Sequence, residues 1–121
     1  MSLLDRLRPP PPPEFRDDRT AGRLEMLVGG RRAGHLSYRR RPGAIAFAHT
    51  EVEPEFEGMG LGGTLVREAL SRARSEGLDV LPFCPFVRSY IERHPDQLDL
   101  VPEDRREEFE LDRLSRGGGD A

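Results

Sequence analysis

The sequence predicts an α/β (α+β) fold in which antiparallel hairpins lead into a strand–helix–strand crossover. Three features support this prediction. Short β-like runs separated by glycine and proline turns fill residues 23–52, an amphipathic helical pattern begins at Leu61, and a short apolar run follows that pattern. A strand, a helix and a second strand at this spacing form a right-handed unit whose two strands are parallel.

Residues 23–52 contain three predicted strands. Arg23–Val28 leads through Gly29-Gly30, a good hairpin turn, into Arg31–Arg40. Pro42-Gly43 then turns the chain into the third strand, Ala44–Val52. These turns make consecutive strands antiparallel.

The third strand has apolar residues on both faces at its start and polar residues on one face at its end. Strict alternation places Ile45, Phe47, His49 and Glu51 on one face. The other face then holds the remaining residues, which are Ala44, Ala46, Ala48, Thr50 and Val52. This pattern is typical of a central strand that runs out into a site.

The predicted helix Leu61–Glu76 carries one apolar stripe, and Gly77 ends it in the usual C-terminal position. Leu78–Phe83 reads as a short buried strand parallel to Ala44–Val52, and it ends at Cys84. A second helix, roughly Phe86–Arg93, starts after Pro85.

A glycine-rich segment, Glu57–Thr64, lies between the third strand and the first helix. Such a turn leaves backbone N–H groups unpaired at the positive end of the helix dipole, so it suits a phosphate or pyrophosphate. The chain contains no lysine, and this anion site needs none. In open α/β sheets ligands gather at this edge, and there the glycine turn meets His49, Glu51, Cys84 and Tyr90.

The composition narrows the class of protein. A chain of 121 residues suffices for one domain with a modest core, and the net charge of −3 argues against a general nucleic-acid binder. The single cysteine rules out an internal disulfide and fits a reducing cytoplasm. No apolar stretch has the length of a transmembrane helix or of a signal core. We therefore expect a soluble cytoplasmic protein without nucleic-acid or membrane partners.

Three regions are expected along the chain. Residues 1–13 form a proline-rich N-terminal tail, residues 14–102 the folded domain, and residues 103–121 a charged, mobile C-terminal tail. A short helix is expected around Arg105–Leu114.

Several stretches resemble a known family. The glycine turn after a strand resembles the acyl-CoA loop of GNAT-type N-acetyltransferases. Together with His49-Thr50-Glu51-Val52, Pro82–Val87 and Tyr90–Pro95, it resembles the small, single-domain GNAT-like proteins of the YjdJ type over about residues 15–102. The resemblance implies a mixed, split sheet with coenzyme A between two diverging parallel strands.

The resemblance also implies residues that bind the cofactor, acetyl-CoA. The pantetheine arm is expected to pair with backbone near Val52 and Glu53. The pyrophosphate is expected on the loop and the first helical turn, which consist of Gly58, Met59, Gly60, Leu61, Gly62, Gly63 and Thr64. Two residues depart from the family's pattern. Glu57 stands where the family usually has an arginine or glutamine, and Met59 stands where it often has a polar residue. A carboxylate near a pyrophosphate is repulsive, so most of the binding should come from backbone amides.

Acetyl transfer to an amine needs a proton acceptor, an oxyanion site and a proton for the departing thiolate. The Val52 N–H would polarise the thioester, Glu51 or His49 would accept the proton, and Tyr90 would protonate the sulfur. In a second route Cys84 takes the acetyl group itself, activated by a neighbour such as His49. Each side chain also has a structural alternative: Cys84 as inert packing, His49 as a hydrogen-bonding residue of the sheet, Glu51 as a solvated strand end and Tyr90 as a cap on the core.

The function expected from these residues is acetyl-CoA-dependent N-acetyl transfer to an exposed amine on a protein, a peptide or a small amine such as a polyamine. The alternative is a coenzyme A or acyl-CoA binding module without turnover, and a third reading is an interaction protein with an inactive site. The three histidines and one cysteine show no metal-ligand spacing, and His35 is assigned no role.

Overall fold

The structure is a computed structural model that describes residues 11–117. Most of the predicted proline-rich tail and the last four residues lie outside this range. Five strands form one sheet in the order of the chain: β1 (Glu14–Asp18), β2 (Arg23–Val28), β3 (Arg31–Arg41), β4 (Ala44–Val52) and β5 (Asp79–Pro82). Neighbouring strands from β1 to β4 are antiparallel, and β4 and β5 are parallel, which confirms the predicted mixed sheet and its crossover.

Strand β1 was not predicted. It lies at the edge of the sheet, where Phe15 is paired with Met26 of β2. The Tyr38 hydroxyl donates a hydrogen bond to the Asp17 carboxylate and so ties β1 to β3. This strand has a single large apolar residue among charged ones, as short edge strands often do, and therefore shows no apolar alternation.

Strand β4 contains a bulge that corrects the predicted faces. Ser37 is paired with His49, whereas Tyr38 is paired with Phe47, so Ala48 is the extra residue. Directly paired residues share a face. Beyond the bulge Thr50 therefore lies on the apolar face of the sheet, and His49 and Glu51 lie on the opposite face. The predicted grouping of His49 and Glu51 with Phe47 is wrong because the bulge shifts the alternation by one residue.

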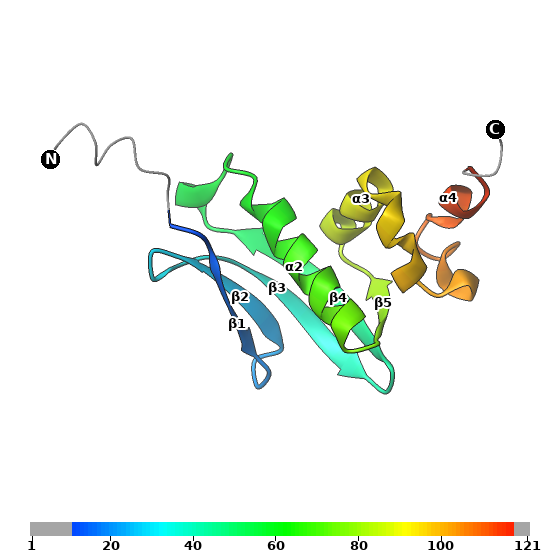
Figure 1. Ribbon diagram of the computed structural model, residues 1–121, viewed down its shortest axis with the longest axis horizontal. Helices are drawn as coiled ribbons and strands as arrows, with labels where there is room; N and C mark the ends of the chain where they lie inside the picture. Colours follow the sequence, from blue (N-terminus) through cyan, green and yellow to red (C-terminus); the bar gives the residue numbers. More distant parts are fainter. Residues whose placement is uncertain (1–10, 118–121) are drawn as a thin grey trace, which may run out of the picture.

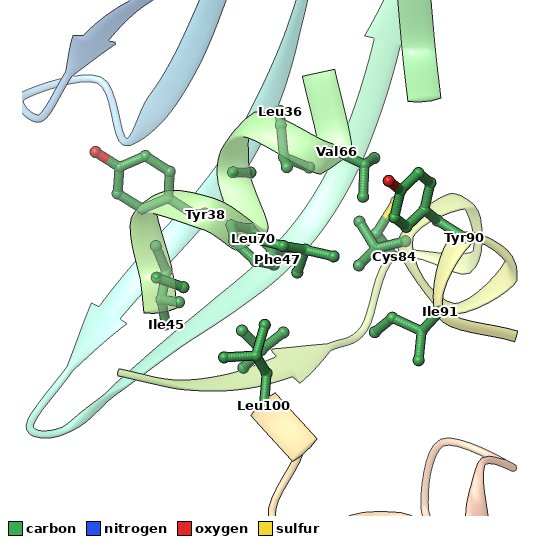
Figure 2. Packing of buried hydrophobic residues seen from close by; sticks show 14 of the residues in the cluster. Leu36, Tyr38, Ile45, Phe47, Val66, Leu70, Cys84, Tyr90, Ile91 and Leu100 are labelled. Carbon is green, nitrogen blue, oxygen red and sulfur yellow. The ribbon is translucent and has the colours of Figure 1, made fainter. Parts of the chain in front are cut away.

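Two helices cover the apolar face of the sheet. Helix α2 (Leu61–Ser75) lies across the sheet, and α3 (Pro85–Arg93) follows β5, as Figure 1 shows. The buried stripe of α2 is the predicted one and includes Leu65, Val66 and Leu70. This stripe packs with Leu36 and Phe47 of the sheet in the core drawn in Figure 2. Both predicted helices are confirmed, with end shifts of one residue.

The segment after α3 packs against the domain. It contains three short helices: η2 (Pro95–Leu100), η3 (Glu103–Arg105) and α4 (Asp112–Gly117). Phe109 and Leu111 belong to the buried core, and the Arg106 guanidinium donates hydrogen bonds to the Val101 and Leu98 carbonyls. The expected mobile tail is thus wrong at these positions, and the helix begins later than predicted. Two isolated apolar residues in an acidic segment gave no periodic signal.

Candidate active site

Strands β4 and β5 separate where the site begins. Their parallel pairing ends at Phe47 and Pro82, and the Cys84 N–H then donates a hydrogen bond to the Phe47 carbonyl at 2.9 Å. Strand β4 continues to Val52 paired only with β3. The second half of β4 therefore has an unpaired edge on the side of β5, which is the split that the sequence resemblance implied.

The free backbone groups on this edge can be identified from the ladder between β3 and β4. The Glu53 N–H donates a hydrogen bond to the Ala33 carbonyl at 2.8 Å. Since hydrogen-bonded and non-hydrogen-bonded pairs alternate in an antiparallel ladder, the Val52 N–H points away from β3, toward the split. This geometry leaves Val52 available to a ligand, whereas the N–H of Glu53 is already used.

Gly34 permits the close approach of β3 and β4 here. It is paired with Val52, and a Cβ atom at this position would lie 2.6 Å from the Glu51 carbonyl oxygen. A side chain at residue 34 would thus push the end of β4 away from β3.

The glycine-rich segment forms one wall of an open groove of about 420 Å³. Gly58 and Gly60 have φ angles of 80° and 73°, which side chains rarely adopt, and Gly60 is the N-cap of α2. At Gly62, on the first turn of α2, a Cβ atom would lie 2.7 Å from the Phe86 ring. The first turn of α2 therefore presents bare backbone to the groove.

Of the nine residues predicted to bind the cofactor, six line the groove: Val52, Gly58, Gly60, Leu61, Gly62 and Gly63. The other three do not. The Thr64 hydroxyl bonds to the Gly60 carbonyl, Met59 is 52% exposed, and Glu53 is bound through its backbone to β3.

Three groove residues were missed in the sequence, namely Phe56, Phe86 and Arg93. Phe86 and Arg93, both on α3, line the groove opposite the glycine-rich segment. They belong to the two stretches on which the family resemblance rests, but only the folded chain places them across from the loop. Arg93 has no ion-pair or hydrogen-bond partner among residues 11–117, and Glu57 lines the same groove.

Cys84 lies at the start of α3 and is 2% exposed. Its Sγ lies 3.3 Å from the Thr50 Oγ1, so Cys84 is on the apolar side of β4. Tyr90, 7% exposed, stacks its ring on His94 at 4.0 Å between centroids. Within the described part of the chain, the Tyr90 hydroxyl has no hydrogen-bond partner. Figure 2 shows Cys84 and Tyr90 at one end of the core and Tyr38 at the other.

His49 and Glu51 lie on the opposite face of β4. Their partners across the sheet place His35 and Glu25 on this face too, and we call it the polar face. The His49 Nε2 is 3.8 Å from the Glu51 Oε2, and their side chains are 64% and 55% exposed. The predicted contact between His49 and Cys84 is not formed, since the two side chains lie on opposite faces of the strand.

Glu25 forms the charged centre of this face. Its buried carboxylate accepts hydrogen bonds from Arg16 and Arg32, and Arg23 lies 3.7 Å away. Burial alone would raise the pKa of Glu25, but the hydrogen bonds from the two arginines outweigh it and lower the pKa below its ordinary value.

The comparisons with known proteins agree with this geometry. A family profile described as GCN5-related N-acetyl-transferase matches residues 23–100, which include the sheet from β2 onward, the groove and α3. The chain belongs to this family of acetyltransferases.

The fold of the acetyltransferase also matches a solved structure. It is similar to the NMR solution structure of a "GCN5-like putative N-acetyltransferase" from Staphylococcus aureus, with a TM-score of 0.58 and 21% identity. The match covers 74% of this chain and 87% of the other. No curated protein matches. The family and the GNAT-like fold are thus confirmed, while the YjdJ subtype stays a prediction.

Two further features are absent from the described part of the acetyltransferase. Residues 11–117 contain no group of three or more histidine, cysteine or acidic side chains placed to hold a metal ion. Over the same residues, no helix combines the length and the apolar character needed to span a bilayer.

Proposed function

We propose that this acetyltransferase moves the acetyl group of acetyl-CoA directly to an amine, with the two substrates on opposite sides of β4. The observation that carries the proposal is the placement of two features around one split strand edge. The glycine-lined groove opens on one side of β4, and the exposed pair His49 and Glu51 lies on the other. The Val52 N–H lies between them.

The groove has the chemistry that a coenzyme A pyrophosphate requires. The first turn of α2 offers backbone N–H groups at the positive end of the helix dipole, and glycines keep side chains away from them. The guanidinium of Arg93, which has no partner within residues 11–117, supplies the positive charge that the lysine-free loop lacks. It also offsets the carboxylate of Glu57 on the same groove.

The split provides the place for the thioester. The Val52 N–H, directed away from β3, donates to the thioester carbonyl and stabilises the oxyanion that forms during attack. The amine nitrogen forms a bond to the carbonyl carbon, and its proton passes to the pair of His49 and Glu51. The carbon–sulfur bond then breaks, and the Tyr90 hydroxyl gives its proton to the departing thiolate.

The competing route through an acetylated Cys84 has less support. The thiol is almost fully buried, and its contact is the hydroxyl of Thr50 rather than a base. A nucleophilic cysteine needs a neighbour that favours the thiolate and room for the thioester to reach it. In direct transfer the proton acceptor is the pair of His49 and Glu51, which is already exposed.

The acceptor is an amine that can reach an exposed strand surface. Both His49 and Glu51 are more than half exposed, so a lysine on another protein, a peptide amine or a polyamine can approach them. The chain contains no lysine side chain of its own to serve as a substrate.

The experiment measures binding and turnover separately. Thermal unfolding with coenzyme A, acetyl-CoA, ATP and NAD tests the groove, because a ligand that binds only the folded state raises the midpoint. Release of free thiol from acetyl-CoA in the presence of a lysine peptide and of spermidine tests transfer. Binding without thiol release would indicate a coenzyme A binding module, and no shift with any coenzyme A species would contradict the proposed groove.

A further inference from the structure

His35 lies beside the exposed pair on the polar face. It occupies the middle of β3, is 8% exposed, and is paired across the ladder with Glu51. Its Nε2 lies 3.8 Å from the Glu51 Oε2, the same oxygen that lies 3.8 Å from the His49 Nε2. The two imidazole rings meet edge to face at 6.3 Å between centroids. One carboxylate oxygen is thus flanked by two imidazoles, one buried and one exposed.

The surroundings of His35 determine which proton it carries. Its Nδ1 is buried without a hydrogen-bond partner among the described residues. A buried N–H without a partner costs more than a bare ring nitrogen, so the favoured tautomer has its proton on Nε2, toward Glu51.

The charges around His35 keep the ring neutral. Burial, foremost, and then the positive charge of Arg32 lower the pKa of His35, and Arg23 and His49 act in the same direction. The charge of Glu51 raises the pKa of His35. The charge of Glu25 is neutralised by the arginines that donate hydrogen bonds to it. At pH 7 His35 is therefore a fixed neutral donor.

We propose that His35 is a positioning residue that holds the Glu51 carboxylate against His49. This inference rests on the proposed function, in which the pair of His49 and Glu51 accepts the acceptor's proton. At 3.8 Å the contact is electrostatic and longer than a hydrogen bond in the free protein. The ladder fixes it nevertheless, because Gly34 lets β3 approach the backbone of Glu51 closely. A Glu51 carboxylate held in this way fixes the orientation of the His49 imidazole relative to the acceptor. The third group of a catalytic triad orients the catalytic base in the same way.

The first test reads the tautomer and needs no activity. Long-range ¹H–¹⁵N spectra of the wild-type protein at pH 7 report which ring nitrogens of His35 are protonated. The proposal expects a neutral ring with its proton on Nε2, and a change of the His35 ring signals in Glu51→Gln. A ring protonated on Nδ1, or on both nitrogens, would overturn the proposal.

The second test is a double-mutant cycle on acetyl transfer. His35→Leu removes the donor and keeps an apolar side chain for the buried site, whereas His35→Gln keeps an N–H donor. We expect His35→Leu to lower kcat about 10-fold with an unchanged KM for acetyl-CoA, as loss of an orienting partner does. His35→Gln should recover most of that loss. In the Glu51→Gln background His35→Leu should have no further effect on kcat.

The cycle also has outcomes that oppose the proposal. Equal losses in both backgrounds would show that His35 does not act through Glu51. A loss that His35→Gln does not recover, at equal unfolding midpoints, would show that an N–H donor at residue 35 is not what supports the rate. Should the wild-type protein transfer no acetyl group, the proposed function fails, and the tautomer experiment alone then decides whether His35 holds Glu51.

Discussion

The two sides of strand β4 are built in different ways. On the apolar side, one wall of the groove is made of backbone: glycines with positive φ angles, the start of α2 and the free edge of the strand at Val52. On the polar side, the site is made of side chains, with Glu51 between His35 and His49. The first arrangement suits a ligand whose charge is constant, and the second suits the movement of a proton.

A single residue separates these two roles along the strand. The bulge at Ala48 turns Thr50 toward Cys84 and directs His49 and Glu51 to the polar face. Without the bulge, the histidine and the glutamate would share a face with Phe47, inside the core. The bulge thus lets one strand line both the proposed cofactor groove and the proposed proton-accepting pair.

The largest expected effect separates proton transfer from binding. Glu51→Gln removes the carboxylate and keeps the shape of the side chain, so we expect kcat to fall by about 10² to 10⁴. The dissociation constant of acetyl-CoA should stay within about 2-fold, because Glu51 faces away from the groove. Steady-state rates and calorimetric binding measure the two quantities. A loss of affinity equal to the loss of rate would place Glu51 on the cofactor side instead.

The next effect breaks the groove and leaves the polar face intact. Gly60→Ala forces a side chain into a φ of 73° at the start of α2 and should weaken acetyl-CoA binding about 10-fold. Gly43→Ala is the matched control, since its φ is 71° and its Cβ would also have open space, at the far end of β4. Both variants should lose about 1 to 2 kcal/mol of stability from the strained backbone. Equal affinities in the two variants would argue against the loop as the binding site.

A third test concerns stability and pH on the polar face. The folded-state pKa of Glu25 lies below its ordinary value, so its stabilising contribution is present above the unfolded-state pKa of about 4.5 and is lost as the pH falls through the folded-state pKa. Glu25→Gln should lower the free energy of unfolding by about 1 to 2 kcal/mol at pH 7, since it replaces charge-assisted hydrogen bonds.

The difference between the wild-type protein and Glu25→Gln should shrink below pH 4.5. Urea unfolding at pH 7, 5 and 3.5 measures it, and a difference that is constant over this range would mean that the arginines do not stabilise the ionised form. The matched control is Asp99→Asn. Its carboxylate also has a lowered pKa, caused first by the hydrogen bond from Arg74, but it lies at an exposed site, so we expect a smaller effect of about 0.5 kcal/mol.

The groove side of the molecule could largely be predicted from the sequence. Glycines with special φ angles, an apolar stripe at helical spacing and a hairpin turn are local signals. They place α2 and the loop near Gly60 without knowledge of the rest of the chain. The mixed sheet follows because β4 and β5 flank a helix that crosses over between them.

The polar face could be predicted only in part. His49 and Glu51 were named as candidates, and that role stays a prediction. The bulge at Ala48 leaves no mark on periodicity, so the face predicted for them was wrong. The role of His35 depends on which residue the ladder places beside it. His35 is buried and lies beside charged residues, and its polar neighbours in the sequence gave no sign of that burial. Cross-strand register depends on contacts between residues far apart in the chain, so it could not be predicted from this one sequence.

The smallest expected effect decides between the two chemical routes. If transfer is direct, Cys84→Ala removes only a buried thiol and its contact with Thr50, so kcat should change by less than about 3-fold while the unfolding free energy drops by about 1 kcal/mol. Intact mass after exposure to acetyl-CoA should then show no added acetyl group in the wild-type protein. A loss of rate as large as that of Glu51→Gln, together with an acetyl adduct that Cys84→Ala abolishes, would contradict direct transfer. It would require Cys84 to become exposed toward the split when the cofactor binds. Because Cys84 and His49 occupy opposite faces of β4, such a result would also mean that a group other than His49 activates the thiol.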